Sequence, residues 1–169
     1  MKHLMIDLET MGNTSTAAIV AIGVCPFEVD RVGEPAMWVI DLQESLDYGM
    51  TVSASTIMWW LEQSDEARLS ILQEPNPLLD VLKVIRDCGA EYFWGHGTFD
   101  LPILANTYLA VGMRIPWHYR NARDLRTLWH MAGFSKDDRH KPEIEHHAGY
   151  DAKAMAMDAG MAMRLLQIK

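Results

Sequence analysis

The chain has 169 residues and a formal net charge of −8, with 49% hydrophobic and 22% charged residues, which excludes a disordered protein and argues against a polyanionic partner. Its two cysteines are too few for a disulfide scaffold, and its apolar runs are far shorter than the ~20 residues that cross a membrane. A chain of this length usually forms one domain, which we expect over residues 1–169. Because acidic residues at positions 7 and 9 interrupt any signal-peptide core, we expect the protein in the cytoplasm, with no membrane partner.

The spacing of apolar residues predicts most of the strands before most of the helices. A short β run over 3–9 is followed by two strand-like segments that could form an antiparallel meander with it, 17–29 and 36–42. Further along, the pattern predicts helices over about 53–62, 64–73 and 77–88, a buried strand over 91–95, and helices over 100–112, 122–132 and 148–167. The polar stretch 135–147 reads as a mobile surface loop. This order predicts an α/β fold with a mixed sheet covered by helices.

Charge is distributed unevenly along the chain. Residues 1–110 carry 5 basic and 16 acidic side chains, whereas residues 111–169 carry 10 basic and 7 acidic ones. Between 114 and 141, Lys and Arg residues alternate with Trp117, Tyr119 and Trp129. Since phosphate attraction is local and aromatic rings stack on bases, this segment could contact nucleic acid. Charge alone nevertheless favours a solvated loop and helix face.

Asp7 and Glu9 lie two residues apart on the first predicted strand, so their side chains project from the same face. Like charges this close repel strongly unless one is protonated or a cation lies between them. An oxygen-rich cluster of this kind suits Mg²⁺ or Mn²⁺. A single Asp-x-Glu pair is also what this composition would produce by chance, so the pair alone does not establish a metal site.

Three further residues are candidates, each with a simpler explanation. Asp100 follows the buried strand and would either cap the next helix or present a ligand group at the end of the sheet. Asp151 opens the last helix, where the helix dipole favours an acid. His146 is either an ordinary loop histidine or a group that takes a proton from water near neutral pH. His147 has the same chemistry, so only position can distinguish the two histidines.

Taken in order, these motifs resemble the DEDDh 3′–5′ exonucleases of the ribonuclease H-like superfamily, relatives of the DNA polymerase proofreading subunit, RNase T and oligoribonuclease. The first motif matches Asp7 to Thr10, the second Gly95 to Asp100, and the third His146 to Ala152. Residues 56–64 and 123–127 are similar to a branch found in phages, prophages and mycobacteria, which includes exonuclease VIII-like prophage proteins. Gly149 and Tyr150 depart from the third motif, where a larger apolar residue and an acid are common.

The resemblance implies a ribonuclease H-like mixed five-stranded sheet flanked by helices. It also implies a metal-dependent exonuclease that releases nucleoside 5′-monophosphates from the 3′ ends of single-stranded RNA or DNA. Asp7, Glu9, Asp100 and Asp151 would hold two divalent ions, Mg²⁺ or Mn²⁺, with Asp7 bridging both. His146, which is in the family register, would deprotonate the attacking water.

Two pairs of adjacent residues in the first half of the chain are weaker candidates for substrate binding. Thr10 and Met11 match positions that contact the terminal nucleotide in relatives, although core packing would equally explain Met11. Trp59 and Trp60 point about 100° apart on one helix. We therefore expect one of them in the core, while the other faces substrate or a partner subunit.

Arg123 and Arg126 lie three residues apart on one face of the predicted helix 122–132 and could hold phosphate, unless Asp124 or another acid neutralises them. Because relatives such as RNase T and oligoribonuclease form dimers, the resemblance also leads us to expect a homodimer. Two other functions remain open at this stage. One is a non-cleaving ribonuclease H-like module that binds nucleic acid, and the other is a phosphodiesterase that acts on small nucleotides.

Overall fold

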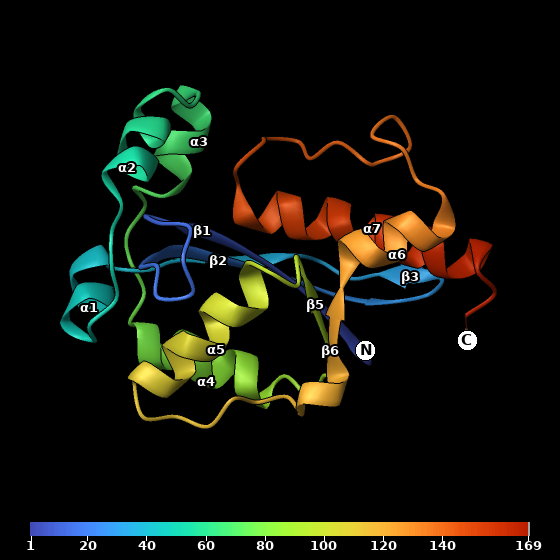
Figure 1. The fold of residues 1–169 in the computed structure, drawn as a ribbon, viewed down its shortest axis with the longest axis horizontal. Helices are drawn as coiled ribbons and strands as arrows, with labels where there is room; N and C mark the ends of the chain where they lie inside the picture. The colour runs from blue at the N-terminus through green and yellow to red at the C-terminus, as the bar shows by residue number, and fades with distance from the viewer. Residues whose placement is uncertain (169) are drawn as a thin grey trace.

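The computed structural model describes residues 1–168 as one mixed sheet with helices on both faces (Figure 1). The strands are β1 (His3–Thr10), β2 (Ile19–Glu28), β3 (Arg31–Val32), β4 (Ala36–Val39), β5 (Tyr92–Gly95) and β6 (Ala122–Asp124). The helices are α1 (Leu42–Asp47), α2 (Ala54–Leu61), α3 (Asp65–Ser70), α4 (Leu78–Asp87), α5 (Asp100–Ala110), α6 (Leu125–Ala132) and α7 (Ala148–Leu165), with a short 3₁₀ turn at Tyr119–Asn121.

β1 lies at the centre of the sheet. It pairs antiparallel with β2 and parallel with β5, in the order β3-β2-β1-β5-β6, and β4 pairs antiparallel with β2. The predicted antiparallel meander of the first three long strands is therefore confirmed. Because β5 and β6 run parallel to β1, the sheet is mixed, as the α/β prediction requires.

The two faces of β1 belong to different halves of the core. Leu4, Ile6 and Leu8 pack toward α4 and α5, whereas Met5 packs on the opposite face with residues of α6 and α7. Figure 1 shows these two helix pairs on opposite sides of the sheet. Since side chains alternate along a strand, Asp7 and Glu9 continue the Met5 face toward α7. The central strand thus carries its two acids out of the core on the α7 side.

The structure corrects the predicted number of strands and two predicted boundaries. The sheet has six strands rather than five, because two short segments with no long apolar run, β3 and β6, join its edges. The predicted helix 122–132 begins only at Leu125, since the Asp124 side chain accepts a hydrogen bond from the Thr127 amide and caps the helix there. The predicted strand 36–42 ends at Val39, because Asp41 caps α1, a helix that the sequence pattern did not predict.

The polar segment 135–147 contains no helix or strand and crosses above α7 in Figure 1. Its middle is attached to that helix, because Asp158 of α7 accepts hydrogen bonds from the backbone amide and the Nδ1 of His140, at 2.9 and 2.6 Å. Within residues 1–168, no helix is both long and apolar enough to cross a membrane.

Candidate active site

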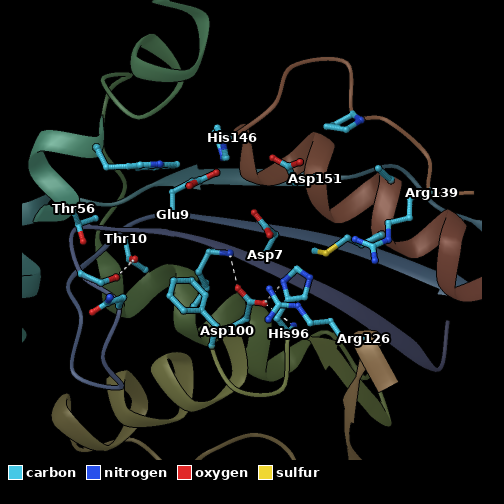
Figure 2. Close-up of a pocket in the computed structure, with 18 of the residues that line it drawn as sticks. Asp7, Glu9, Thr10, Thr56, His96, Asp100, Arg126, Arg139, His146 and Asp151 are labelled. Carbon is cyan, nitrogen blue, oxygen red and sulfur yellow. Dashed lines mark hydrogen bonds and ion pairs between the residues drawn. The ribbon is translucent and has the colours of Figure 1, made fainter. Parts of the chain in front are cut away.

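A cavity of about 730 Å³ opens beside the end of β1, between α2, α6 and α7 (Figure 2). All five predicted catalytic residues line it: Asp7, Glu9, Asp100, His146 and Asp151. They come from β1, from the start of α5, from the segment that leads into α7, and from the first turn of α7. The fold therefore gathers residues that are up to 144 positions apart in the sequence around one space.

A glycine opposite Asp7 lets α7 approach the sheet. Gly23 of β2 pairs with Asp7, and a Cβ at Gly23 would lie 2.0 Å from the carbonyl oxygen of Ala148. The first turn of α7 therefore packs directly on the β2 backbone, which brings Asp151 to the face that carries Asp7. Sequence analysis missed Gly23. Its only signal was a glycine within an otherwise apolar strand.

Asp100 is buried, with 1% of its surface exposed, and links two segments of backbone. One carboxylate oxygen accepts a hydrogen bond from the Leu8 amide of β1 at 3.2 Å, and the other accepts one from the His96 amide at 2.7 Å. The residue that caps α5 is Phe99, so the interpretation of Asp100 as the helix cap is wrong. Gly95 leaves room for this arrangement, because a Cβ there would lie 3.0 Å from the Asp100 Cβ.

Burial and neighbouring carboxylates raise the pKa values of Asp7 and Glu9. The pKa of Asp7 lies well above its usual range because of burial and because of the charges of Asp100, Glu9 and Asp151. Burial, followed by the charges of Asp151 and Asp100, raises the pKa of Glu9 to about 8. Burial likewise raises the pKa of Asp151 to about 6, against hydrogen bonds from the His147 and His146 backbone that lower it. Among residues 1–168, no Lys or Arg forms an ion pair with any of the four acids.

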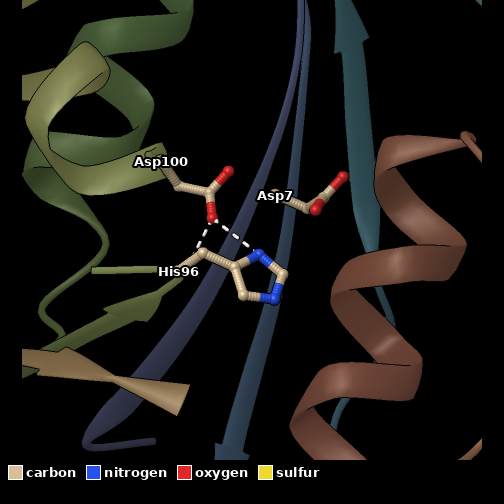
Figure 3. Close-up of side chains that lie close together, drawn as sticks. All are labelled: Asp7, His96 and Asp100. Atoms are coloured by element: carbon tan, nitrogen blue, oxygen red, sulfur yellow. Dashed lines mark hydrogen bonds and ion pairs between the residues drawn. The ribbon is translucent and has the colours of Figure 1, made fainter. Parts of the chain in front are cut away.

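Two overlapping groups in this cluster could each hold a cation. Asp7, Glu9 and Asp151 present ligand atoms within 4.8 Å of one another, and so do Asp7, His96 and Asp100. Figure 3 shows the second group, in which His96 Nδ1 lies 3.3 Å from a carboxylate oxygen of Asp100. Asp7 belongs to both groups. Sequence analysis did not single out His96, whose only signal was its place in the glycine-flanked turn before Asp100.

The two adjacent histidines take different positions. His146 lines the cavity with a left-handed backbone (φ 62°), and its ring centroid lies 4.8 Å from that of Trp59. His147 instead caps α7, where its Nδ1 accepts a hydrogen bond from the Tyr150 amide at 3.3 Å. Burial lowers the pKa of His147, which contacts a separate cavity. Position thus distinguishes the pair, with His146 alone facing the acids.

The adjacent tryptophans also differ. Trp60 is 4% exposed and donates its indole N–H to the Thr10 carbonyl at 2.9 Å, so the prediction that one of the two is in the core is confirmed. Trp59 is 39% exposed and lines the cavity together with Thr56 and Thr10. Met11 is partly buried and is not one of the residues that line the cavity.

The two predicted phosphate-binding arginines do not share a helix face. Arg126 lies on α6 and lines the cavity. Arg123 lies on β6, one residue before Asp124, the residue that caps the start of α6. The guanidinium carbon of Arg123 lies 4.6 Å from the centre of the Tyr92 ring. The same guanidinium donates a hydrogen bond to the Arg120 carbonyl at 2.6 Å. It lines a different cavity. The prediction that Arg123 and Arg126 act from one helix face is therefore wrong.

Comparison with known proteins agrees with this arrangement. Residues 2–162 match a family described as the 3′-5′ exoribonuclease Rv2179c-like domain. The chain belongs to this family. It is thus a 3′–5′ exonuclease domain, and the activity class that the motifs implied is confirmed at this level. Among solved structures, the exonuclease domain is similar to "Exonuclease X in complex with 5′ overhanging duplex DNA", with a TM-score of 0.54 and 16% identity over 96% of this chain and 91% of that chain. At this identity the likeness concerns the fold. No curated protein matches the chain.

Proposed function

We propose that this domain is a metal-dependent 3′–5′ exonuclease of the DEDDh type, which releases nucleoside 5′-monophosphates from single-stranded nucleic acid. The observation that carries the proposal is the set of four carboxylates that surround one cavity without a Lys or Arg partner among the described residues, in a chain of this family. Because the family is described by exoribonuclease activity, RNA is the substrate that we expect to be cut faster.

The donor set fits hard divalent cations. Carboxylate oxygens are the ligands that Mg²⁺ and Mn²⁺ prefer. The raised pKa values of Asp7 and Glu9 result from burial and from the charges of neighbouring acids, and bound cations would offset both effects. We assign one ion to Asp7, Glu9 and Asp151, and a second to Asp7 and Asp100 beside His96. When bound, the ions supply positive charge for the reacting phosphate and lower the pKa of water.

His146 is the residue that we assign as proton acceptor. It lies at the edge of the acidic cluster, and the Trp59 ring contacts it edge-on, which orients the imidazole toward the cavity. In the reaction, a water oxygen forms a bond to the terminal phosphorus and passes its proton to His146. The bond from phosphorus to the 3′-oxygen of the preceding nucleotide breaks, and that oxygen takes up a proton.

The terminal nucleotide would occupy the end of the cavity formed by Thr10, Thr56 and Trp59. The exposed ring of Trp59 offers a stacking surface for a base, and backbone groups around Thr10 are available for the sugar. Met11 is a weaker candidate than the sequence suggested, because it does not line the cavity.

A homodimer remains part of the proposal. Helices α2 and α3 expose several large apolar side chains: Ile57, Met58, Leu61 and Leu69. Exposed apolar side chains that gather on one surface often mark a contact between proteins, so these two helices are our candidate for the dimer contact. Light scattering after size exclusion gives the mass directly, and a monomer at micromolar concentration would contradict the dimer.

The experiment that tests the activity is digestion of single-stranded RNA and DNA labelled at either end, with Mg²⁺, with Mn²⁺ or with chelator. We expect shortening from the 3′ end and mononucleotide 5′-phosphates as products, both lost with chelator. Cleavage of dinucleotides alone would support a small-nucleotide phosphodiesterase. Binding without cleavage under either metal would support the non-cleaving module and contradict the proposal.

A further inference from the structure

Two buried side-chain N–H groups have no hydrogen-bond partner in residues 1–168: Nε1 of Trp129 and Nε of Arg139. Buried polar groups in folded proteins nearly always have a partner, so each exception requires an explanation. Both residues line the proposed active-site cavity, although one comes from α6 and the other from the loop 135–147. Two unpaired donors at one wall of the same cavity indicate a site for an acceptor.

The positive charge of Arg139 is also without a partner. Its guanidinium carbon lies 4.0 Å from the centre of the Trp129 ring, and no acid lies within ion-pair distance in the described part of the chain. The acid whose pKa responds to Arg139 is Asp158, but that carboxylate already accepts both hydrogen bonds from His140. Stacking on the tryptophan holds the guanidinium in place without neutralising it.

Arg126 adds a second cation to this wall. It lies three residues before Trp129 on α6, on the same helix face, and it lines the same cavity. Figure 2 shows Arg126 and Arg139 at one end of the cavity and Thr10 and Thr56 at the other, with Asp7 between them. We call Arg126, Trp129 and Arg139 the basic wall.

We propose that the basic wall binds the phosphodiester immediately upstream of the one that is cleaved. This inference rests on the proposed function, which places the reacting phosphate at the acids and the 3′-terminal nucleotide near Thr10. The nucleic acid strand then enters over α6 and the loop 135–147. The wall offers N–H donors and positive charge, a combination that matches phosphate oxygens. A base is a poorer fit, because Arg139 already covers one face of Trp129.

The test combines a charge change in the substrate with a charge change in the protein. Single-stranded oligonucleotides carry one neutral methylphosphonate, either at the second phosphate from the 3′ end or at the fifth, and otherwise match the unmodified strand. The protein is the full chain or its Arg139→Met variant, in which the unbranched side chain still packs on Trp129. The control variant is Arg164→Met, which removes an exposed arginine that binds the Val29 carbonyl on a distant part of α7.

In the wild-type protein, we expect the methylphosphonate at the second phosphate to lower kcat/KM about tenfold, as the loss of one charge-assisted hydrogen bond does. Arg139→Met should lower kcat/KM for the unmodified strand by about the same factor. In this variant, the methylphosphonate at the second phosphate should lower kcat/KM hardly any further. A methylphosphonate at the fifth phosphate, and the Arg164→Met substitution, should each have little effect on kcat/KM. A merely structural role of Arg139 would not make the variant insensitive to one particular phosphate.

Two results would overturn the inference. In the first, Arg139→Met and the methylphosphonate at the second phosphate each lower kcat/KM by the same factor whether or not the other change is present. In the second, a methylphosphonate lowers kcat/KM equally at the second and at the fifth phosphate. If Arg139→Met lowers the melting temperature markedly, Arg126→Met replaces it, since that side chain is exposed. Binding of the same strands, followed by fluorescence anisotropy, keeps the two proposals distinguishable. Wild-type protein that fails to cleave but shows this coupling in binding would contradict the exonuclease and retain the phosphate site.

Discussion

Two regions of the cavity lack partners of opposite charge: the acidic centre, which consists of Asp7, Glu9, Asp100 and Asp151, and the basic wall. In the acidic centre no Lys or Arg pairs with the carboxylates in the described residues, and burial together with the neighbouring negative charges raises the pKa values of Asp7 and Glu9. At the basic wall, Arg139 has neither an ion pair nor a partner for its Nε among residues 1–168. The acids and arginines share one cavity, yet no ion pair joins them in the described structure. We infer that each region binds an external partner: metal ions at the acidic centre and phosphate at the basic wall.

Removing the central acid should have the largest effect. Asp7→Asn keeps the shape of the side chain but removes the carboxylate that both candidate cation groups share. We expect kcat/KM for single-stranded RNA to fall by about a thousandfold or more, because the bound metals contribute several kcal/mol to the transition state. Steady-state digestion measures the loss.

The control for this variant is Asp41→Asn, which alters an exposed helix cap far from the cavity. Its activity should stay near that of the wild type. An Asp7→Asn protein that folds normally and retains more than about a tenth of the activity would show that the acidic centre is not the catalytic site.

The adjacent histidines offer a matched pair of variants. Asn tolerates the left-handed backbone of His146 and is also a good helix cap at position 147, so the same substitution is compatible with both positions. His146→Asn should lower kcat by about 10²- to 10⁴-fold, as expected for loss of a general base. His147→Asn should leave kcat nearly unchanged. Equal losses in the two variants would contradict the assignment of His146.

At the nucleotide end of the cavity, Trp59→Ala should weaken substrate binding with a smaller effect on chemistry. Loss of one stacked base typically costs about 1–3 kcal/mol, so we expect KM to rise by about tenfold or more. Trp59→Phe should recover much of this loss. Met58→Ala, on the same helix but outside the cavity, is the control. An unchanged KM for Trp59→Ala would exclude this stacking surface.

The strain in the acidic centre should also be visible as pH-dependent stability. Folding raises the pKa of Glu9 from 4.5 to about 8, so the folded state holds a proton that the unfolded state releases between these values. The free energy of unfolding of the metal-free protein should therefore fall as pH rises through this window, by up to about 1.4 kcal/mol per pH unit from this group. Asp7, whose pKa is also raised, acts in the same direction.

Glu9→Gln removes this titration. We expect the variant to be more stable than the wild type at pH 8 and similar to it at pH 4.5, while losing activity. Urea denaturation with chelator present at the two pH values provides the measurement. A Glu9→Gln protein that is less stable than the wild type at pH 8 would mean that Glu9 is not strained.

The sequence predicted the parts of this site that depend on local periodicity. Alternation along the first strand placed Asp7 and Glu9 on one face, and the fourth predicted strand placed Asp100 just after β5, at the start of α5. Features that depend on tertiary contacts had no such signal. Gly23 matters because α7 packs on it, and His96 because Asp100 binds its amide.

The error at Arg123 has a similar cause. The composition of 122–132 fits a helix, but the Asp124 side chain also accepts a hydrogen bond from the Gly97 amide, which holds it next to the loop that precedes α5. Because this contact spans 27 residues, the helix start could not be located from local pattern alone. The separation of Arg123 from Arg126 followed from that boundary.

The most direct test of the central claim, that the acidic centre binds metal ions, is a calorimetric titration of the full chain with Mn²⁺ near pH 7.5. We predict two ions per chain, with protons released on binding because Glu9 holds one in the metal-free protein. Asp7→Asn should abolish or greatly weaken the binding of both ions, since Asp7 belongs to both groups. No binding at millimolar Mn²⁺, or binding that Asp7→Asn leaves unchanged, would contradict the account.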